Sequence, residues 1–295
     1  MMAVSKEFTA CLEEQLSKVV NQQLKLKHVS SVSGGSINAA YCLHTNLGDY
    51  MMKRNNKNAY PGMFKCEAEG LAAIRNTKSI AVPEFILLAE FEEDSLLVLE
   101  WIENTRSTTE ASKLLGRQLA AMHRCTAKQF GFDSDNYMGS LLQSNTKHDT
   151  WTDFFIHQRL QPMVKIAADK QLLNSKDVRL FDKLYTNLPG IFTEEPPAFI
   201  HGDLWGGNYL IGTKLKPYLI DPAISYGHRE FDIAMTTLFG GFGSDFYDAY
   251  HENFTLAKGW QQRVNLWNLY PLLLHLNLFG SSYLGQVRGC LMDYV

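Results

Sequence analysis

Two short runs of the sequence combine polar residues in a spacing typical of phosphoryl transfer. The run HGDLWGGN spans 201–208 and places Asp203 five positions before Asn208, while LIDP at 219–222 ends an apolar stretch with Asp221. In phosphoryl transfer, one carboxylate accepts the proton of the attacking hydroxyl, and an asparagine with a second carboxylate holds Mg²⁺ on the nucleotide phosphates. We therefore predict that Asp203 is the catalytic base and that Asn208 and Asp221 are metal ligands.

The neighbouring residues favour a geometry that brings these groups together. Residues 209–211 and 217–220 have the composition of two short strands, joined by the turn-like run 212–216. An antiparallel hairpin would place Asn208 and Asp221 at its open end, where their oxygens suit Mg²⁺. An ordinary surface hairpin is the alternative, but it does not account for several residues in fixed order. Because His-Gly replaces the His-Arg of protein kinases, we expect a small-molecule substrate.

A glycine pair and a lysine upstream are predicted to bind the nucleotide. The run SGGSIN at 33–38 precedes a strand-like segment, and Gly34, Gly35 and Ser36 would let backbone N–H groups approach phosphates. Lys53 follows on the next strand-like segment, where kinases carry the lysine that binds the α- and β-phosphates. A lone Gly-Gly pair is more often a hairpin turn, so this prediction depends on Lys53.

The helix predicted for residues 61–75 supplies a partner for Lys53. Its apolar residues recur at helical spacing and form one stripe, made of Phe64, Leu71 and Ile74. Glu67 falls on that stripe, whereas Glu69 points about 140° away. Because a carboxylate on a packed helix face is costly unless it is paired, we predict an ion pair between Glu67 and Lys53.

Two more strand-like segments, at 84–89 and 96–102, complete the first half of the chain. The second ends in Glu100, Trp101 and Ile102, which we predict by position to form the hinge that binds adenine. Helical patterns dominate after this point, and the only plausible domain boundary lies near residue 103. We therefore expect a nucleotide-binding unit at 1–102 and a catalytic and substrate-binding unit at 103–295.

Composition excludes several other classes of function. The 295 residues carry 28 Lys and Arg against 31 Asp and Glu, a net charge of −3, so no general field for nucleic acid is expected. The first residues lack the pattern of a signal peptide, and polar residues interrupt the apolar stretch 266–284, which favours a buried helix over a membrane span. The five cysteines form no C-x-x-C pair. We expect a cytoplasmic protein with no membrane, nucleic-acid or obligate protein partner.

The motifs resemble those of the fructosamine kinase family over residues 30 to 285. The matching runs are SGGSIN (33–38), MFKCE (63–67), FGF (130–132), DNYMG (135–139), HGDLWGGN (201–208), IDPAISYGHRE (220–230), LFGGF (238–242) and HLNLFG (275–280). The resemblance implies an α+β, bilobal protein-kinase-like fold. Its small N-terminal lobe would hold an antiparallel sheet and one key helix, and its larger C-terminal lobe would be mainly helical.

The resemblance also implies an activity and its cofactors. Members of the family use ATP and Mg²⁺ to phosphorylate the sugar 3-hydroxyl of ketosamines, namely fructosamine, ribulosamine or erythrulosamine adducts on small amines or protein lysines. The product then breaks down and releases the amine, a deglycation repair. By the motif match, Asp203 is the base and Lys53 pairs with Glu67 to anchor the phosphates. Some relatives carry Cys at the position of Ser36, so a disulfide dimer through this loop is not expected here.

Other interpretations remain open at this stage. Trp205 offers a ring face for a sugar or an aliphatic amine stem, although it could equally be a core residue. It favours ketosamines over aminoglycosides, choline or another amino alcohol, which a kinase of the same fold could phosphorylate. A nucleotide-binding module without catalysis is a further alternative, which the presence of all five residues (Lys53, Glu67, Asp203, Asn208 and Asp221) disfavours.

Overall fold

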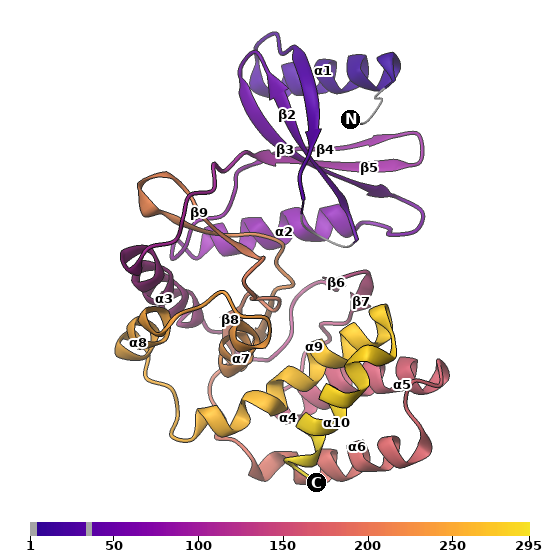
Figure 1. The fold of residues 1–295 in the computed structure, drawn as a ribbon, viewed down its shortest axis with the longest axis vertical. Helices are drawn as coiled ribbons and strands as arrows, with labels where there is room; N and C mark the ends of the chain where they lie inside the picture. Colours follow the sequence, from indigo (N-terminus) through magenta and orange to yellow (C-terminus); the bar gives the residue numbers. More distant parts are fainter. Residues whose placement is uncertain (1–4, 34–36) are drawn as a thin grey trace.

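In the computed structural model, which describes residues 5–33 and 37–295, the chain forms two lobes of unequal size joined by a narrower waist (Figure 1). The smaller lobe contains the N-terminus and a twisted sheet, and the larger lobe is mainly helical. This confirms the predicted α+β bilobal architecture. The predicted phosphate-binding residues Gly34, Gly35 and Ser36 lie outside the described residues, so their role stays a prediction.

The N-terminal lobe is built on one antiparallel sheet of five strands in the order β1-β2-β3-β5-β4. Its elements are α1 (Lys6–Val20), β1 (Leu26–Ser31), β2 (Ala39–Thr45), β3 (Gly48–Asn56), α2 (Met63–Asn76), β4 (Phe85–Phe91) and β5 (Asp94–Glu100). Figure 1 shows α1 on the outer side of the sheet and α2 on the side that faces the larger lobe. Helix α2 is therefore the key helix that the sequence predicts.

Local sequence explains why these elements form. Ser5 accepts a hydrogen bond from the Phe8 amide at 3.1 Å and caps α1, whose apolar residues then face the sheet. The β2–β3 hairpin keeps an unbroken register from the pair Ala39–Arg54 to the pair Thr45–Gly48. Because alternate strand residues share a face, this register decides which side chains point toward the larger lobe.

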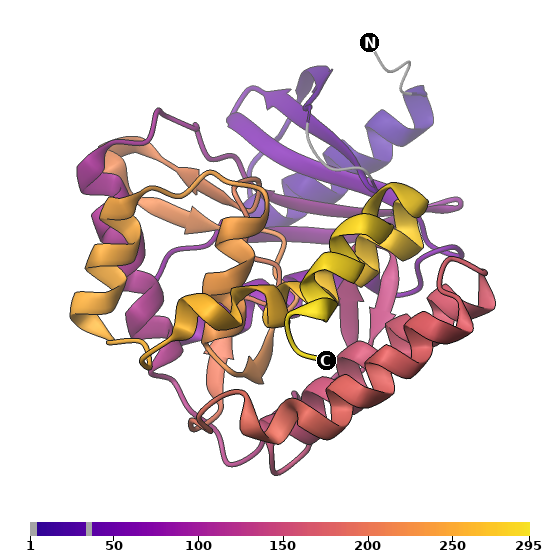
Figure 2. The same cartoon turned by 60° about the horizontal axis from the view of Figure 1, so that its bottom comes forward.

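The C-terminal lobe packs helices around an aromatic core. Its helices are α3 (Thr109–His123), α4 (Trp151–Phe154), α5 (Gln161–Asp169), α6 (Ser175–Asn187), α7 (Glu230–Leu238), α8 (Ser244–Asn253), α9 (Val264–Phe279) and α10 (Leu284–Met292). Trp151, Phe154, Phe155 and Trp267 are fully buried in its centre. Figure 2 shows α5 and α6 along one side of the lobe and α9 running through it.

The larger lobe also contains three two-stranded sheets. They pair β6 (Asn136–Met138) with β7 (Leu141–Gln143), β8 (Ala198–Ile200) with β11 (Ser225–Gly227), and β9 (Tyr209–Ile211) with β10 (Pro217–Leu219). The last pair is the predicted hairpin, and it is antiparallel with Leu219 opposite Tyr209. The run 201–208, which the sequence predicts to be catalytic, is therefore the connection between β8 and β9.

The segment 151–160 is one turn of α-helix followed by a π-helix (Phe155–Leu160). Two element boundaries differ from the sequence prediction. Helix α9 ends at Phe279, because Gly280 adopts a φ of 90° that favours glycine. Strand β5 already begins at Asp94, and the turn before it uses Glu92 at a φ of 52°. Within residues 5–33 and 37–295, we find no helix that combines the length and the hydrophobicity of a membrane span.

Candidate active site

The loop that follows β8 is shaped by a glycine that no other residue can replace without strain. Gly202 has a φ of +82°, and a Cβ at this position would lie 2.1 Å from the carbonyl oxygen of Ala223. The chain after Asp221 therefore passes directly against the catalytic loop, and the Ala223 amide donates to the His201 carbonyl at 2.9 Å. The glycine of the HGD run is thus required by close backbone contact.

Asp203 and Asn208 interact directly. The Asn208 side-chain nitrogen donates to the Asp203 backbone carbonyl at 2.8 Å and to its Oδ2 at 3.0 Å. Burial raises the pKa of the Asp203 carboxyl to about 7, although the hydrogen bond from Asn208 lowers it. Because the amide nitrogen of Asn208 is used on Asp203, its side-chain oxygen is the atom that it can offer to a cation.

The second predicted metal ligand lies beside the first. The amide of Ile220 donates to the carbonyl of Asn208 at 3.1 Å, which extends the hairpin to its open end. Asp221 then adopts a φ of 55°, an unusual conformation for a residue other than glycine. Strained backbone of this kind is common where function fixes a side chain. The structure thus places Asn208 and Asp221 on adjoining segments, as predicted.

Lys53 joins the two lobes at this point. Its Nζ lies 2.7 Å from Glu67 Oε1, and it also forms an ion pair with Asp221 of the larger lobe. The Lys53 side chain is only 8% exposed and that of Glu67 only 10%. This confirms the predicted pair of Lys53 with Glu67, since the alternative Glu69 faces solvent and approaches Lys65 at 3.8 Å.

Helix α2 is itself held against the segment that carries Asp221. A Cβ built on Gly70 would lie 3.0 Å from Pro222 Cγ, so only a small residue allows this approach. Gly70 follows Glu67 by three positions and therefore lies on the same helix face. The close contact positions Glu67 between the sheet and the larger lobe, where Lys53 can reach both acidic partners.

Asp232 of α7 binds the backbone at the start of the catalytic loop. Its carboxylate accepts the His201 amide at 2.7 Å, the Gly202 amide at 2.9 Å and His123 Nε2 at 3.1 Å. Burial alone would raise the pKa of Asp232, but the hydrogen bond and charge of His123 and the other donors outweigh it and lower the pKa. His123 also contacts the Tyr250 hydroxyl at 2.8 Å, so it is a structural residue that connects α3 to α7 and α8.

Glu230 has a different role from that of Asp232. Among the described residues, Asp232 contacts the catalytic loop, whereas the partners of Glu230 lie elsewhere. Glu230 is buried and accepts from the Arg263 guanidinium at 2.5 and 2.8 Å and from the Trp267 indole at 3.1 Å. It therefore connects α7 to the start of α9.

Two sets of supporting residues were not predicted. His201 is buried and its Nε2 contacts the Ile220 carbonyl at 3.0 Å, which ties the catalytic loop to the strand before Asp221. Asn136 donates to the Ile224 carbonyl at 2.9 Å, and Gln143 donates to Asn136 at 2.8 Å. Polar residues within otherwise apolar short strands were the available signal, since buried polar groups need partners.

The predicted hinge residues lie at the end of β5 and directly after it. Glu100 is the last residue of β5 and its amide donates to the Glu84 carbonyl at 2.8 Å. Trp101 donates from its indole to Glu103 at 3.2 Å, while Ile102 is buried. The chain then attaches to the larger lobe through Thr105, whose amide donates to the Ile211 carbonyl at 2.7 Å.

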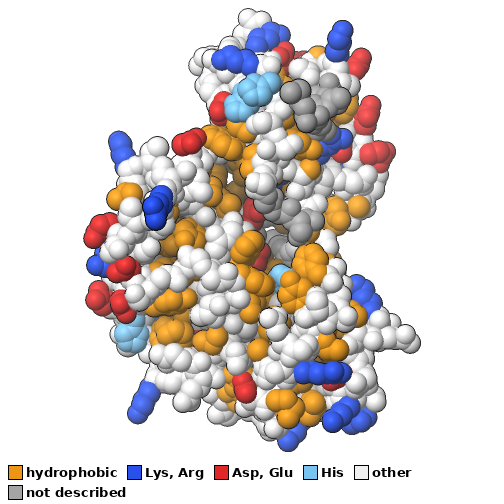
Figure 3. All heavy atoms as spheres, in the orientation of Figure 1, with side chains coloured by type: hydrophobic (Ala, Val, Ile, Leu, Met, Phe, Trp, Pro, Cys, Tyr) orange, Lys and Arg blue, Asp and Glu red, His pale blue; other side chains and the backbone are white. Residues whose placement is uncertain are grey.

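Trp205 belongs to a row of aromatic side chains beside the catalytic loop. It is half-buried, and its ring meets Phe239 edge-on at 5.9 Å, which in turn lies 4.9 Å from His275. His275 also contacts Phe279 and Tyr283 at 5.4 and 5.1 Å. Trp205 is therefore a half-buried residue at the edge of the core of the larger lobe, against which it packs. Figure 3 shows acidic side chains recessed at the waist, with hydrophobic side chains gathered on the larger lobe beside it.

The loop after α7 is pressed against the catalytic loop. A Cβ on Gly206 would lie 2.7 Å from the Gly240 carbonyl oxygen, and one on Gly241 would lie 2.8 Å from Gly206 Cα. The Tyr209 hydroxyl also donates to the Gly241 carbonyl at 2.7 Å. The loop that carries Phe239 is therefore in direct backbone contact with the segment that carries Asp203.

Comparison with known proteins agrees with this geometry. The model of the family described as fructosamine kinase matches residues 9–295. A probable ketoamine kinase of Enterococcus faecium is 38% identical over 283 residues, covering 94% of this chain and 99% of that protein. The chloroplastic protein-ribulosamine 3-kinase of Arabidopsis thaliana is 36% identical over 279 residues, covering 92% and 83%.

Solved structures show the same likeness. A proposed fructosamine-3-kinase from Thermobifida fusca has a TM-score of 0.85 at 34% identity, covering 96% of this chain and 98% of that one. Spectinomycin phosphotransferase has a TM-score of 0.61 at 13% identity, which shows a shared fold alone. The chain therefore belongs to the fructosamine kinase family, and the prediction that it is a phosphotransferase is confirmed.

Proposed function

We propose that this protein is an ATP- and Mg²⁺-dependent ketosamine 3-kinase that acts in deglycation. The observation that carries this proposal is the meeting of Asp203, Asn208, Asp221 and Lys53 around one site, in a chain of the fructosamine kinase family. Such an arrangement supplies a base, two oxygen ligands and a phosphate-binding cation, which together suffice for phosphoryl transfer.

Each of these residues has a defined task. Asp203 accepts the proton of the sugar 3-hydroxyl, and Asn208 orients its carboxylate through the hydrogen bond to Oδ2. Lys53, held by Glu67, binds the nucleotide phosphates and compensates their negative charge. Hinge residues Glu100 to Ile102 and the loop of Gly34 to Ser36 complete the nucleotide site, and we place the division between the lobes at 102/103.

The donor set fits Mg²⁺. Asn208 offers a carboxamide oxygen and Asp221 a carboxylate that is 40% exposed, so both are hard oxygen ligands on adjoining segments. A Mg²⁺ ion bound there would supply charge neutralisation at the nucleotide phosphates. We also propose a cytoplasmic location, which the five free cysteines support.

Substrate assays test this function directly. The purified protein should phosphorylate a ribulosyl-lysine derivative at the 3-hydroxyl, with the position established by NMR of the product. Choline and a kanamycin-type aminoglycoside serve as competing acceptors, because the catalytic residues do not distinguish them. Absence of turnover on the ketosamine would contradict the proposal, and efficient turnover on either competitor would replace it by another amino-alcohol kinase. Tight Mg·ATP binding without any transfer would indicate a nucleotide-binding module.

Replacing Lys53 by Met should lower kcat/KM by about 10²-fold, the usual effect of removing one electrostatic contact to a transition state. The loss has two causes, since the phosphates lose a cation and the buried Glu67 loses its partner. Steady-state kinetics on the ketosamine measure it. Lys65→Met on the exposed side of α2 is the matched control and should keep full activity. Unchanged activity of Lys53→Met would contradict the assigned role.

Replacing Trp205 by Ala should raise the KM for the ketosamine about ten-fold, because an aromatic contact contributes roughly 1 kcal/mol or more. The KM for ATP should change less than three-fold, because the Trp205 ring contacts Phe239 of the larger lobe, whereas the Lys53–Glu67 pair belongs to the N-terminal lobe. Initial rates with each substrate varied in turn separate the two effects. Trp260→Ala, a half-buried tryptophan beside Tyr247, is the control. Equal changes in both KM values would show that Trp205 is merely structural.

A further inference from the structure

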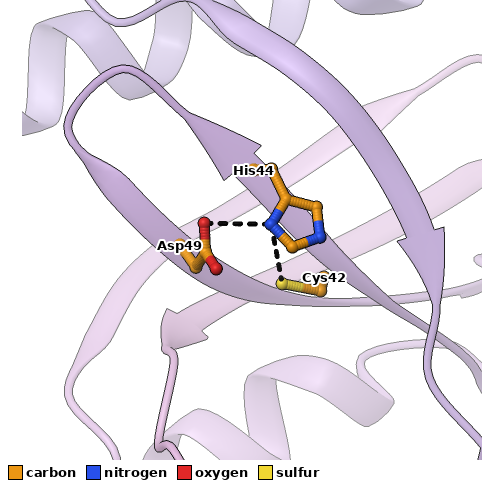
Figure 4. A group of neighbouring side chains, drawn as sticks. All are labelled: Cys42, His44 and Asp49. Carbon is orange, nitrogen blue, oxygen red and sulfur yellow. Dashed lines mark hydrogen bonds and ion pairs between the residues drawn. The ribbon is translucent and has the colours of Figure 1, made fainter.

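A group of potential metal ligands lies in the N-terminal lobe, away from the catalytic residues. Cys42, His44 and Asp49 come from the β2–β3 hairpin, and their ligand atoms all lie within 4.8 Å of one another (Figure 4). His44 Nδ1 is 3.1 Å from Asp49 Oδ1 and 3.8 Å from Cys42 Sγ. We propose that these three side chains form a binding site for Zn²⁺ or a similar borderline transition-metal ion.

The strand register explains why the three side chains converge. Cys42 and His44 are two residues apart on β2 and therefore share one face of the sheet, while Asp49 is the direct partner of His44 on β3. This is the face of Lys53, because Asp49 and Lys53 are four residues apart on the same strand. The site thus lies on the side of the sheet that faces the larger lobe, about 13 Å along the strand from Lys53.

The spacing of the donor atoms suits a tetrahedral ion. Zinc lies about 2.3 Å from sulfur and about 2.0–2.2 Å from nitrogen or oxygen, so tetrahedral donors are separated by about 3.3–3.6 Å. The separations from His44 Nδ1 to Asp49 Oδ1, 3.1 Å, and to Cys42 Sγ, 3.8 Å, lie on either side of this range, and all three ligand atoms lie within 4.8 Å of one another. Water can occupy the remaining position, since the side chains of His44 and Asp49 are 26% and 38% exposed and leave a path for the ion.

The environment of His44 is arranged as in protein metal sites. Its other ring nitrogen, Nε2, contacts the Ser30 hydroxyl at 2.9 Å, which fixes the ring with Nδ1 toward Cys42 and Asp49. The ring of His28 stacks on it at 4.0 Å and restrains it further.

Cys42 itself is buried, and burial raises the pKa of its thiol to about 11, with Asp49 and Glu103 adding to the effect. The thiol proton leaves when the ion binds.

The chemistry of the ligands distinguishes this site from the proposed Mg²⁺ site. Thiolate and imidazole favour zinc, cobalt or copper, whereas Mg²⁺ prefers an all-oxygen set such as Asn208 and Asp221. An excess of Mg²⁺ therefore leaves the hairpin site open to Zn²⁺ while it occupies the oxygen site. The proposal is independent of the kinase function, because it rests on the hairpin residues alone.

Metal titration tests the proposal. The chelator-treated protein, kept in excess Mg²⁺, should bind one equivalent of Zn²⁺ in competition with a chromophoric chelator. Cys42→Ser and His44→Gln should each weaken binding by more than about 100-fold, and Ser30→Ala by about 10-fold. Cys125→Ser, which removes a half-buried thiol of the larger lobe, should bind Zn²⁺ as the wild type does.

Spectroscopy with Co²⁺ as the probe identifies the ligands. The wild type and Cys125→Ser should show the thiolate-to-cobalt charge-transfer band, which should be absent in Cys42→Ser. Thermal unfolding followed by circular dichroism establishes that each variant is folded, and His44→Gln, at a half-exposed position, provides the test if Cys42→Ser does not fold. The proposal is overturned if the wild type binds no Zn²⁺. It is also overturned if folded Cys42→Ser or folded His44→Gln still binds one full equivalent of Zn²⁺ or still shows the thiolate-to-cobalt band.

Discussion

Replacing Asp203 by Asn should reduce kcat on a ketosamine by about 10²–10⁴-fold, the range attributed to a general base. The nucleotide dissociation constant should change by no more than a few-fold, because the base acts on the acceptor hydroxyl in the transition state. The substitution keeps the shape of the side chain, and its amide oxygen can still accept the hydrogen bond that Asn208 donates. Rapid-quench kinetics and equilibrium nucleotide binding measure the two quantities.

The thermal stability of the Asp203→Asn variant distinguishes a chemical role of Asp203 from a structural one. Burial raises the pKa of this carboxyl to about 7, which means that the site disfavours the negative charge. An uncharged Asn should therefore leave the midpoint of thermal unfolding unchanged or slightly higher. Asp133→Asn is the matched control and should retain activity. Asp133 lies on the protein surface, where its carboxylate pairs with Lys147 at 2.6 Å. A marked loss of stability or of nucleotide affinity in Asp203→Asn would show that Asp203 is mainly structural.

Replacing Asp232 by Ala should lower the free energy of unfolding by about 3–5 kcal/mol, the cost of removing one member of a buried charged network. The carboxylate is fully buried and accepts three hydrogen bonds, from the amides of His201 and Gly202 and from His123. These three donors would be left without an acceptor in the protein interior. Urea unfolding measures the change, provided that the slope with denaturant is unaltered.

The pH dependence of this loss gives a second check. The pKa of Asp232 is lowered in the folded protein, so the stability from its carboxylate is fully present above the ordinary aspartate pKa of about 4 and is lost as pH falls through the lower folded value. The difference between wild type and Asp232→Ala should therefore narrow on acidification. Asp248→Ala, at an exposed position of α8, should stay within about 0.5 kcal/mol of wild type. A loss below about 1 kcal/mol for Asp232→Ala would show that the network is not cooperative.

Local sequence patterns predicted much of the fold and of the candidate site. The period of the apolar residues in α2 correctly selected Glu67 over Glu69, and the run around Asn208 and Asp221 correctly predicted a hairpin. In both cases the information is short-range, because a helix or a hairpin fixes the relative direction of side chains a few residues apart. The resemblance of several motifs to those of one family predicted the bilobal fold, with the sheet-containing lobe first and the helical lobe second.

Contacts between residues far apart in the sequence could not be predicted from local patterns. Nothing in the pattern around residue 230 reveals that Asp232 reaches the catalytic loop while Glu230 pairs with Arg263, since their partners lie about 30 positions away in the sequence. The same holds for Asn136, which binds the carbonyl of Ile224 across 88 positions. Such pairings depend on tertiary packing, and a single sequence shows only that a buried polar residue needs some partner.

The contact between Gly206 and Gly240–Gly241 has a consequence for the size and attachment of the acceptor. Because backbone meets backbone there, any movement of the segment that carries Asp203 away from the loop that carries Phe239 would break a close-packed contact. We therefore expect that a sugar on a protein is modified only when a long, flexible side chain carries it outward from its own chain. Under the proposed function, adducts on an α-amino group close to folded backbone should not be phosphorylated. The reach of the modified side chain, more than the identity of the amine, would then decide which adducts this protein acts on.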